Sequence, residues 1–282
     1  MAKRVSVIGD AVSSEFFFPL WHQYYSQLFG AKSIFLVTYK DQAPLFQNFE
    51  LGGLWEIPAQ YNDILRASAI SAMVTTLLTV SDIVIRVDTD EFLVPDPSHS
   101  ADLRDYVAKL SKPYVTGRGM NIIQHPDEPP IDLSSPILIR QRAYAQPVGP
   151  LNKTCLTSVP FKWTPGFHFG SHFPVFDSLF LFHMKHADIG MQMDLRAWMT
   201  SMTPGNLVLQ EYNKPDLDRI KAHQVNSFGL PVVTGDSSVY REDFCERFLK
   251  TFEYVPAQGY YHGQNVYDPN IVKIPERFEN LI

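Results

Sequence analysis

The stretch that decides the fold is Ile83-Val84-Ile85-Arg86-Val87-Asp88-Thr89-Asp90-Glu91. Its first part is apolar and β-branched except at Arg86, which predicts a buried strand. Three acids follow with no spacer between them and the strand. Because the removal of a carboxylate from water is unfavourable, such a cluster needs cations or water beside it. The stretch therefore predicts a polar site at the end of a core strand.

Strand and helix patterns alternate upstream of this stretch. Strands are predicted at 5–10, 33–39 and 54–58, and helices at 15–28 and 64–79, the second capped by Asn62 or Asp63. This alternation predicts an α/β fold with a mostly parallel central sheet and flanking helices, which binds ligands beyond the carboxyl ends of its strands. Gly9 and Asp10 end the first strand, so we expect them to share one crevice with the acids at 88–91.

The pattern changes after residue 95. A short helix is predicted at 101–110 and a strand at 114–123, and residues 137–190 are predicted as strands and loops. From about residue 191, helices are predicted at 194–202, 217–223 and 242–252 between proline-rich connections. No flexible linker stands out. We therefore expect a single domain over residues 1–282, with a catalytic core of about 1–190 and a C-terminal helical extension of about 191–282.

Composition excludes several classes of protein. The chain has 282 residues, 45% of them hydrophobic, and a net charge of −6, which is typical of a globular protein and disfavours a nucleic-acid partner. Two cysteines, Cys155 and Cys245, exclude a disulfide-rich scaffold and are expected to be reduced. The N-terminus has only a brief apolar run, and no stretch is long enough to span a membrane. We expect a cytoplasmic protein, with peripheral membrane contact left open.

The acids themselves point to a metal. On an extended segment Asp88 and Asp90 point the same way, because side chains alternate with period two. Two such carboxylates form a hard oxygen site suited to Mg²⁺ or Mn²⁺, with water and substrate phosphates as the other ligands. The alternative is that the acids only solvate a turn or cap the next segment. Their position in a series of alternating strands and helices favours the metal site.

These motifs also carry a family resemblance. Residues 83–95 resemble the strand and D-x-D-E-F-[LI] signature of GT-A glycosyltransferases, in the family 2-like and galactosyltransferase-type groups. Residues 15–31 are similar to the opening of that group, and residues 61–66 to the polar stretch and arginine before its D-x-D helix. The resemblance covers about residues 5–95 well and 150–190 loosely. One departure is the end of the first strand, Gly9-Asp10-Ala11-Val12, where the family has a different polar pair.

The resemblance implies a Rossmann-like GT-A fold and a nucleoside-diphosphate sugar donor, UDP- or GDP-linked. It implies that Asp88 contacts the ribose or the metal, that Asp90 binds the metal, and that Arg66 helps to bind the donor. Members of the group often take a third metal ligand from a late strand, and His183 is our candidate for it. The acceptor we expect is a glycan or a lipid-linked acceptor.

Further candidates come from the residue types. Lys153 and Lys185 are suited to compensate the diphosphate charge. Glu91 and Asp188 are candidate general bases, with Asp127 as an equal alternative. Four histidines, at 168, 172, 183 and 186, lie close together in sequence, but no cysteine pair supports a zinc site. The aromatic residues at 260–262 are interpreted either as a sugar site or as core packing.

Two other functions compete with sugar transfer. A sugar nucleotidyltransferase usually carries a glycine-rich G-x-G-T/S-R loop after its first strand, which residues 9–14 do not match. A non-catalytic carbohydrate-binding protein on the same fold is the second alternative, because a fold alone does not establish a reaction.

Overall fold

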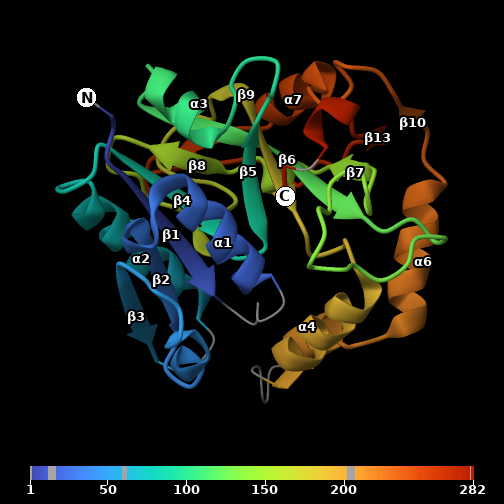
Figure 1. Ribbon diagram of the computed structural model, residues 1–282, viewed down its shortest axis with the longest axis horizontal. Helices are drawn as coiled ribbons and strands as arrows, with labels where there is room; N and C mark the ends of the chain where they lie inside the picture. Colours follow the sequence, from blue (N-terminus) through green and yellow to red (C-terminus); the bar gives the residue numbers. More distant parts are fainter. Residues whose placement is uncertain (1, 12–16, 59–61, 202–206, 280) are drawn as a thin grey trace.

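The computed structural model describes residues 2–11, 17–58, 62–201, 207–279 and 281–282 (Figure 1). Its strands are β1 Val5–Ala11, β2 Ile34–Tyr39, β3 Gly53–Ile57, β4 Ile83–Asp88, β5 Glu91–Pro95, β6 Tyr114–Ile123, β7 Tyr144–Pro147, β8 Thr154–Thr157, β9 Phe176–His183, β10 Val232–Val233, β11 Glu253–Val255, β12 Tyr260–His262 and β13 Ile271–Lys273. Its α-helices are α1 Phe18–Phe29, α2 Asp63–Leu77, α3 Leu103–Lys109, α4 Ile189–Ser201, α5 Leu207–Tyr212, α6 Leu217–Phe228 and α7 Glu242–Leu249. Short 3₁₀ turns are η1 Ala31–Ser33, η2 Ala43–Phe46, η3 Gly149–Leu151, η4 Pro165–Phe167 and η5 Glu276–Phe278.

One 11-stranded sheet organises the described part of the chain, in the order β10-β13-β7-β6-β8-β4-β1-β2-β3, with β9 paired to both β6 and β5. Strands β3, β2, β1 and β4 are mutually parallel. Among the described strands of this sheet, β5, β7 and β8 are antiparallel to the others. The prediction of an α/β fold with a mostly parallel central sheet and flanking helices is therefore confirmed.

The first ninety residues fold largely as their pattern predicts. Asn62 caps α2, and its side-chain oxygen accepts a hydrogen bond from the backbone N–H of Leu65 at 3.0 Å. Helix α1 spans Phe18–Phe29, and Gly30 follows it with a φ of 86°, which suits glycine. The predicted start of this helix at 15–16 lies outside the described residues.

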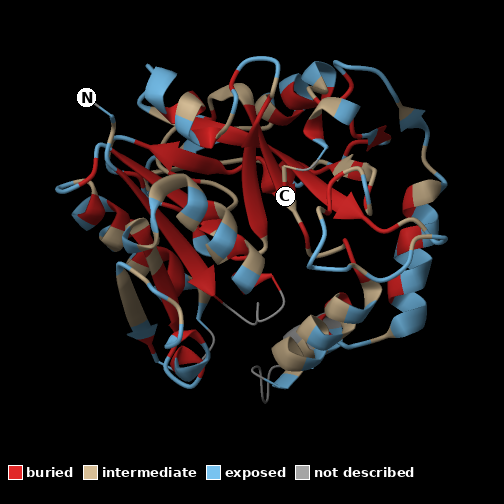
Figure 2. Cartoon of the chain, viewed as in Figure 1, coloured by how far each residue is buried: buried red, intermediate tan, exposed pale blue. Residues whose placement is uncertain are grey.

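The strands bury both of their faces. Alternate residues of β1 and β4, such as Val7 and Ile85, pack with α1, whereas Ile8 and Val84 pack with α2 on the other face. Figure 2 shows the central strands buried, whereas the edge strand β3 and the outer sides of the helices are partly exposed. This double cover explains why the strands of the first half are almost continuously apolar, and it leaves their carboxyl ends as the open edge.

The C-terminal part contributes strands to the sheet as well as helices. Strand β13 pairs with β7 and β10, while β11 and β12 form a separate hairpin. Helices α4 and α6 lie to one side of the sheet, opposite β1–β3 (Figure 1). Helix α4 begins at Ile189, earlier than the predicted 194, because Asp188 accepts a hydrogen bond from the N–H of Met191 at 3.0 Å and so caps it. Ile282 is buried near the middle of the molecule.

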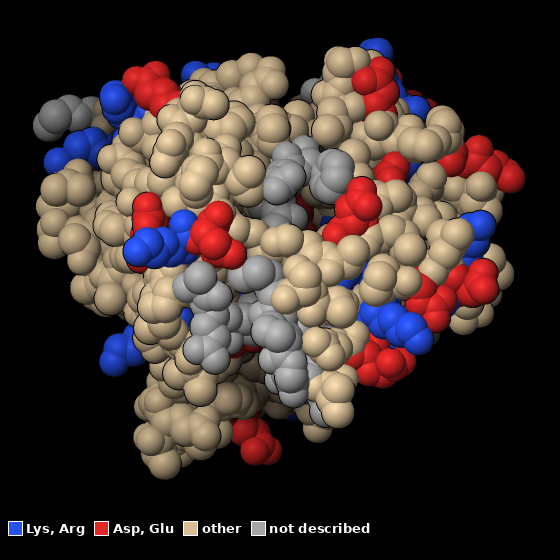
Figure 3. Space-filling view, turned by 90° about the horizontal axis from the view of Figure 1, so that it is seen from below, with Lys and Arg blue, Asp and Glu red and all other residues tan. Residues whose placement is uncertain are grey.

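Three further properties concern the whole chain. Cys155 and Cys245 are both buried and unpaired. Among the described residues, no helix combines the length and apolar character needed to cross a membrane. On the face shown in Figure 3, basic and acidic side chains are interspersed and form no patch of a single sign.

Candidate functional site

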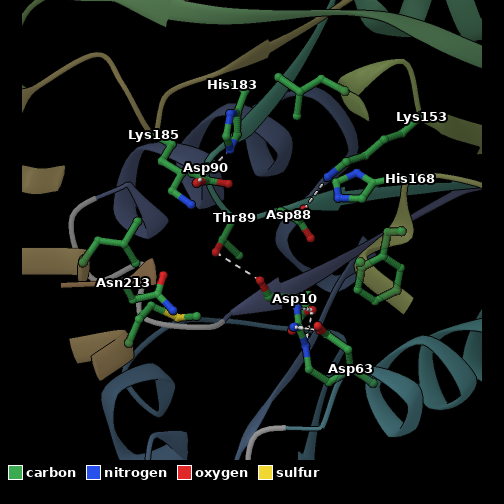
Figure 4. A pocket seen from close by; sticks show the side chains of 16 residues that line it. Asp10, Asp63, Asp88, Thr89, Asp90, Lys153, His168, His183, Lys185 and Asn213 are labelled. Atoms are coloured by element: carbon green, nitrogen blue, oxygen red, sulfur yellow. Dashed lines mark hydrogen bonds and ion pairs between the residues drawn. The ribbon is translucent and has the colours of Figure 1, made fainter. Parts of the chain in front are cut away.

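A pocket of about 390 Å³ lies at the carboxyl ends of β1 and β4 (Figure 4). Its walls come from the ends of β1, β4 and β9, the start of α2, the segment from η3 to Lys153, the loops after β8 and β9, helix α4 and the residue after α5. The lining residues are Asp10, Asp63, Arg66, Asp88, Thr89, Asp90, Leu151, Lys153, Gly166, Phe167, His168, His183, Lys185, Leu195, Met199 and Asn213. Four acids and three Lys or Arg residues in one small pocket make it suited to a charged ligand.

Asp10 and Asp88 are brought together by strand register. They are direct partners across the parallel pair β1 and β4. The chain then turns at Thr89 and Asp90, and the Thr89 hydroxyl donates to the backbone oxygen of Asp10 at 3.3 Å. The backbone N–H of Met184 donates to the Asp90 carbonyl at 2.9 Å, which ties this turn to the end of β9. The acids at the two strand ends therefore face the same space.

Asp88 belongs to a buried ionic network. Lys153 Nζ lies 2.8 Å from Asp88 Oδ2 and 2.6 Å from Glu91 Oε1, and Arg86 donates to Asp88 Oδ1. Burial alone would raise the pKa of Asp88, but Arg86 and Lys153 outweigh it and hold that pKa far below its usual range. Burial and the Asp88 charge raise the pKa of Glu91. The pKa of Lys153 is raised, because its two acid partners outweigh the burial that lowers it.

Lys153 is positioned by a close contact between β6 and the turn η3. A Cβ at Gly119 would overlap the backbone of Leu151, so only glycine allows this approach. The N–H of Gly119 donates to Asn152 Oδ1 at 2.8 Å, which fixes the residue before Lys153. The position of the ammonium group therefore depends on a glycine far from it in sequence.

Asp90 and His183 form the second pair of the pocket. His183 ends β9, between β5 and β6, and its Nε2 lies 3.3 Å from Asp90 Oδ2. Its Nδ1 lies 2.6 Å from Asn121 Oδ1. Because an amide oxygen can only accept, Nδ1 carries the proton and donates it to Asn121. Nε2 therefore faces a carboxylate, and either a second proton or a metal ion must lie between them.

The remaining cations differ in how well they are paired. Arg66 donates to Asp10 through Nε at 2.9 Å and to Asp63 through Nη1 at 2.6 Å. The ammonium group of Lys185 makes no hydrogen bond or ion pair with any residue that the structure describes. Burial lowers the pKa of Lys185, and Asp90 partly opposes this. Lys185 is thus a half-buried cation available to an anionic ligand.

The loop at 164–170 forms a strained wall of the pocket. Phe167 has a φ of 61°, unusual for a bulky residue, and follows Gly166 with a φ of 76°. Its ring covers the guanidinium of Arg86, with 3.5 Å between Cζ and the ring centroid. The Nδ1 of His168 donates to the Pro150 carbonyl at 2.7 Å. Burial and the charge of Lys153 lower the pKa of His168 to about 4, so its Nε2 is a neutral acceptor near pH 7.

The structure places three of the sequence-based candidates outside the lining of the pocket. Glu91 is fully buried against Lys153 and does not line the pocket, so it cannot take a proton from a substrate bound there. Asp188 caps α4 and also accepts from the N–H of Ile131 at 2.8 Å, away from the pocket. Gly9 is buried beneath the ring of Trp21 and serves packing. The other candidates, Asp10, Arg66, Asp88, Asp90, Lys153, His183 and Lys185, all line the pocket.

Sequence reasoning missed Asn121, Asn213 and the α4 wall. Asn121 had a detectable signal, a polar side chain inside the otherwise apolar end of β6. Leu195 and Met199 of α4, and Asn213 after α5, carry no such signal in the sequence. No local pattern indicates that these segments lie over the strand ends. Within the described ranges, no cluster of three or more His, Cys, Asp or Glu residues has the arrangement of a complete metal site. Protein ligands for a metal would therefore be few.

Comparisons with known proteins give little further information. No protein-family model matches the chain, and no curated protein sequence does. Among solved structures, the chain is similar to mannose-1-phosphate geranyltransferase from Thermus thermophilus, with a TM-score of 0.30 and 8% sequence identity. That match covers 74% of this chain and 67% of the other. A likeness this weak carries no argument about substrate or reaction.

Proposed function

We propose that this protein is a metal-dependent glycosyltransferase that moves a sugar from a nucleoside-diphosphate donor, UDP- or GDP-linked, to a glycan or lipid-linked acceptor. The observation that carries the proposal is the meeting of Asp90 and His183 in a pocket that also holds the ammonium group of Lys185. The sequence resemblance of residues 83–95 to the D-x-D-E-F signature supports it.

The residues present fit a divalent ion such as Mn²⁺ or Mg²⁺. Asp90 supplies a carboxylate oxygen. His183 presents the lone pair of Nε2, because its ring proton is on Nδ1, where it is hydrogen-bonded to Asn121. A hydrogen bond from the second ring nitrogen is the usual support of a metal-bound histidine. These ions commonly take only one or two protein side chains and leave their other positions to water and phosphate. Two protein ligands are therefore enough, and Asp88 is a third candidate only if it releases Arg86 or Lys153.

The rest of the pocket suits the remaining parts of such a donor. Lys185 would pair with a phosphate oxygen as a point charge. Asp10, Arg66 and Asp63 form a polar group with donors and acceptors for the nucleoside end. A bound metal would supply charge neutralisation for the departing diphosphate. With Glu91 and Asp188 outside the pocket, the neutral Nε2 of His168 is an acceptor that could orient a sugar hydroxyl.

The first experiment measures thermal unfolding with UDP, GDP and a set of nucleotide sugars, with and without Mn²⁺. We expect at least one nucleotide to raise the midpoint by roughly 5 °C at saturation when Mn²⁺ is present, and much less without it. The Asp90→Ala and His183→Ala variants should lose the metal-dependent part. Asp127→Ala removes an exposed carboxylate outside the pocket and is the matched control, which should behave as the wild type.

Two results would contradict the proposal. One is that no nucleotide gives a shift that depends on metal. The other is that Asp90→Ala and Asp127→Ala lose the shift equally, which would show that general charge and not the pocket is responsible.

A further inference from the structure

A second site candidate lies on the hairpin β11–β12 and the loop that precedes β9. Here aromatic side chains gather that are not part of the buried core, and we name this set the aromatic platform. Its members are Phe169, Phe173, Phe252, Tyr254, Tyr260, Tyr261 and His262. Tyr254 is 50% exposed and Phe173 39% exposed, values that are high for large aromatic side chains. Core packing therefore does not account for these two side chains, and the other five members are partly buried around them.

The rings form one continuous set. Tyr261 lies at the centre, with its ring centroid 5.0 Å from that of Tyr254 and 5.6 Å from that of Phe173. Phe252 continues the set, 5.8 Å from Phe173 and 5.5 Å from Phe169. The contact of Tyr254 with Tyr261 is tilted and the other three are edge-on, and contacts of these kinds restrict the orientation of each ring. A ligand would therefore meet a preformed surface, which lowers the entropy lost on binding.

The platform is joined to the wall of the pocket. The N–H of Tyr261 donates to the carbonyl of Gly170 at 2.8 Å, and Gly170 is also bridged to Trp163. A Cβ at Gly170 would overlap the ring of Phe161, so glycine is required for this approach. The same loop carries Phe167 and His168, which line the pocket. The first member of the platform, Phe169, thus follows His168 of the pocket wall directly in the sequence.

The chemistry of the platform selects an uncharged ligand with apolar faces and polar edges. The segments that carry most of it, residues 169–173 and 253–262, contain no Lys or Arg and a single acid, Glu253, so they lack the cations that a nucleic acid requires. A pyranose ring presents C–H groups on its face, which stack on aromatic rings, and hydroxyls at its edge. The tyrosine hydroxyls of the platform can bond to such an edge.

We propose that the aromatic platform binds an oligosaccharide, and that it holds the acceptor glycan while the end of that glycan enters the pocket. The second half of this statement rests on the proposed function, whereas the binding of oligosaccharide does not. The platform would then favour an acceptor with several sugar rings, because the rings outside the pocket can stack on its aromatic side chains.

The experiment titrates the full-length protein with soluble oligosaccharides of glucose, xylose, mannose, galactose and N-acetylglucosamine, by calorimetry and by NMR of the saccharide. The test variants are Tyr254→Ala and Phe173→Ala. We expect each to weaken the affinity for the best saccharide about tenfold. Tyr254→Phe keeps the ring and should bind within about threefold of the wild type. Tyr267→Ala removes a tyrosine that is 58% exposed but lies outside the platform, and should leave binding unchanged.

The outcomes separate this proposal from the proposed function. Titrations are repeated in EDTA and with Asp90→Ala, and oligosaccharide binding should persist in both. If it persists while no nucleotide shows a metal-dependent shift, the platform stands and the transferase proposal fails. If no oligosaccharide binds the wild type, or if Tyr254→Ala weakens binding no more than Tyr267→Ala, the platform proposal is overturned.

Discussion

Asn121 sets the chemical state of the histidine beside it. Its buried side-chain oxygen accepts a hydrogen bond from the Nδ1–H group of His183, and the two residues are register partners across β6 and β9. The lone pair of Nε2 is therefore directed at Asp90. Asn121 touches no substrate in this arrangement and would act as a positioning residue for a metal ligand.

We predict that Asn121→Leu weakens Mn²⁺ binding by roughly 10- to 100-fold, because His183 loses the acceptor that fixes its tautomer. Titration of Mn²⁺ followed by electron paramagnetic resonance measures this directly. Asn121→Asp keeps an acceptor at the same place and is the control, which should bind Mn²⁺ at least as well as the wild type. If the wild type and Asn121→Leu bind Mn²⁺ with equal affinity, Asn121 does not position the metal ligand His183.

At the scale of elements, sequence reasoning was sufficient where a local pattern decides the structure. Strands β1 to β4 follow from apolar runs, and α2 from the cap at Asn62. The neighbours of β9 could not be predicted, because its pairing with β5 and β6 joins segments far apart in the chain. The acidic triplet was recognised from its local pattern. The ion pairs of Asp88 with Arg86 and Lys153 were not predicted, because Lys153 lies far away in the sequence. The burial of Glu91 against Lys153 could not be predicted either, because no local pattern shows that its side chain faces inward.

The end of β5 is tied to the C-terminal segment by one carboxylate. Asp96 accepts from Tyr240 at 2.7 Å and from Arg277 Nε and Nη2, both at 2.8 Å. Ser98 adds hydrogen bonds from its N–H and hydroxyl. Burial alone would raise the pKa of Asp96, but Arg277 and Ser98 outweigh it and hold that pKa well below its usual range.

This lowered pKa predicts a stability that depends on pH. A carboxyl group whose pKa is lower in the folded than in the unfolded chain stabilises fully above the unfolded value of 3.8, and less as the pH falls below it. We expect Asp96→Asn to lower the free energy of unfolding by about 2 kcal/mol at pH 7, and by clearly less near pH 3. Urea unfolding at both pH values measures the difference. If Asp96→Asn lowers the free energy of unfolding by the same amount at pH 7 and at pH 3, the charge of Asp96 is not responsible for the effect.

At the scale of the whole molecule, the C-terminal part completes the sheet. Strand β13 pairs with β7, Phe278 is fully buried among the rings of β9, and the carbonyl of Ile282 accepts from the N–H of Ile137 at 2.7 Å. The predicted division into a core of about 1–190 and an extension of about 191–282 therefore does not correspond to a break in the sheet.

We predict that a chain truncated after residue 190 does not fold by itself. It would expose the edge of β7 and the apolar surface around Phe180 and Phe182, which Phe278 covers. Near-ultraviolet circular dichroism and urea unfolding would show a loss of fixed aromatic packing and no cooperative transition. A cooperative transition in the truncated chain would instead establish residues 1–190 as an independent domain.

The pairing of β5 with β9 also has a consequence for synthesis. All five residues of β5 pair with β9, whose residues leave the ribosome only after the long segment between residues 95 and 176 has been made. At typical rates of translation this takes on the order of ten seconds. During that time an apolar strand beside the acidic turn has no partner, and its edge is open to other chains. The nascent chain therefore carries this open strand until β9, which ends at His183, has been made.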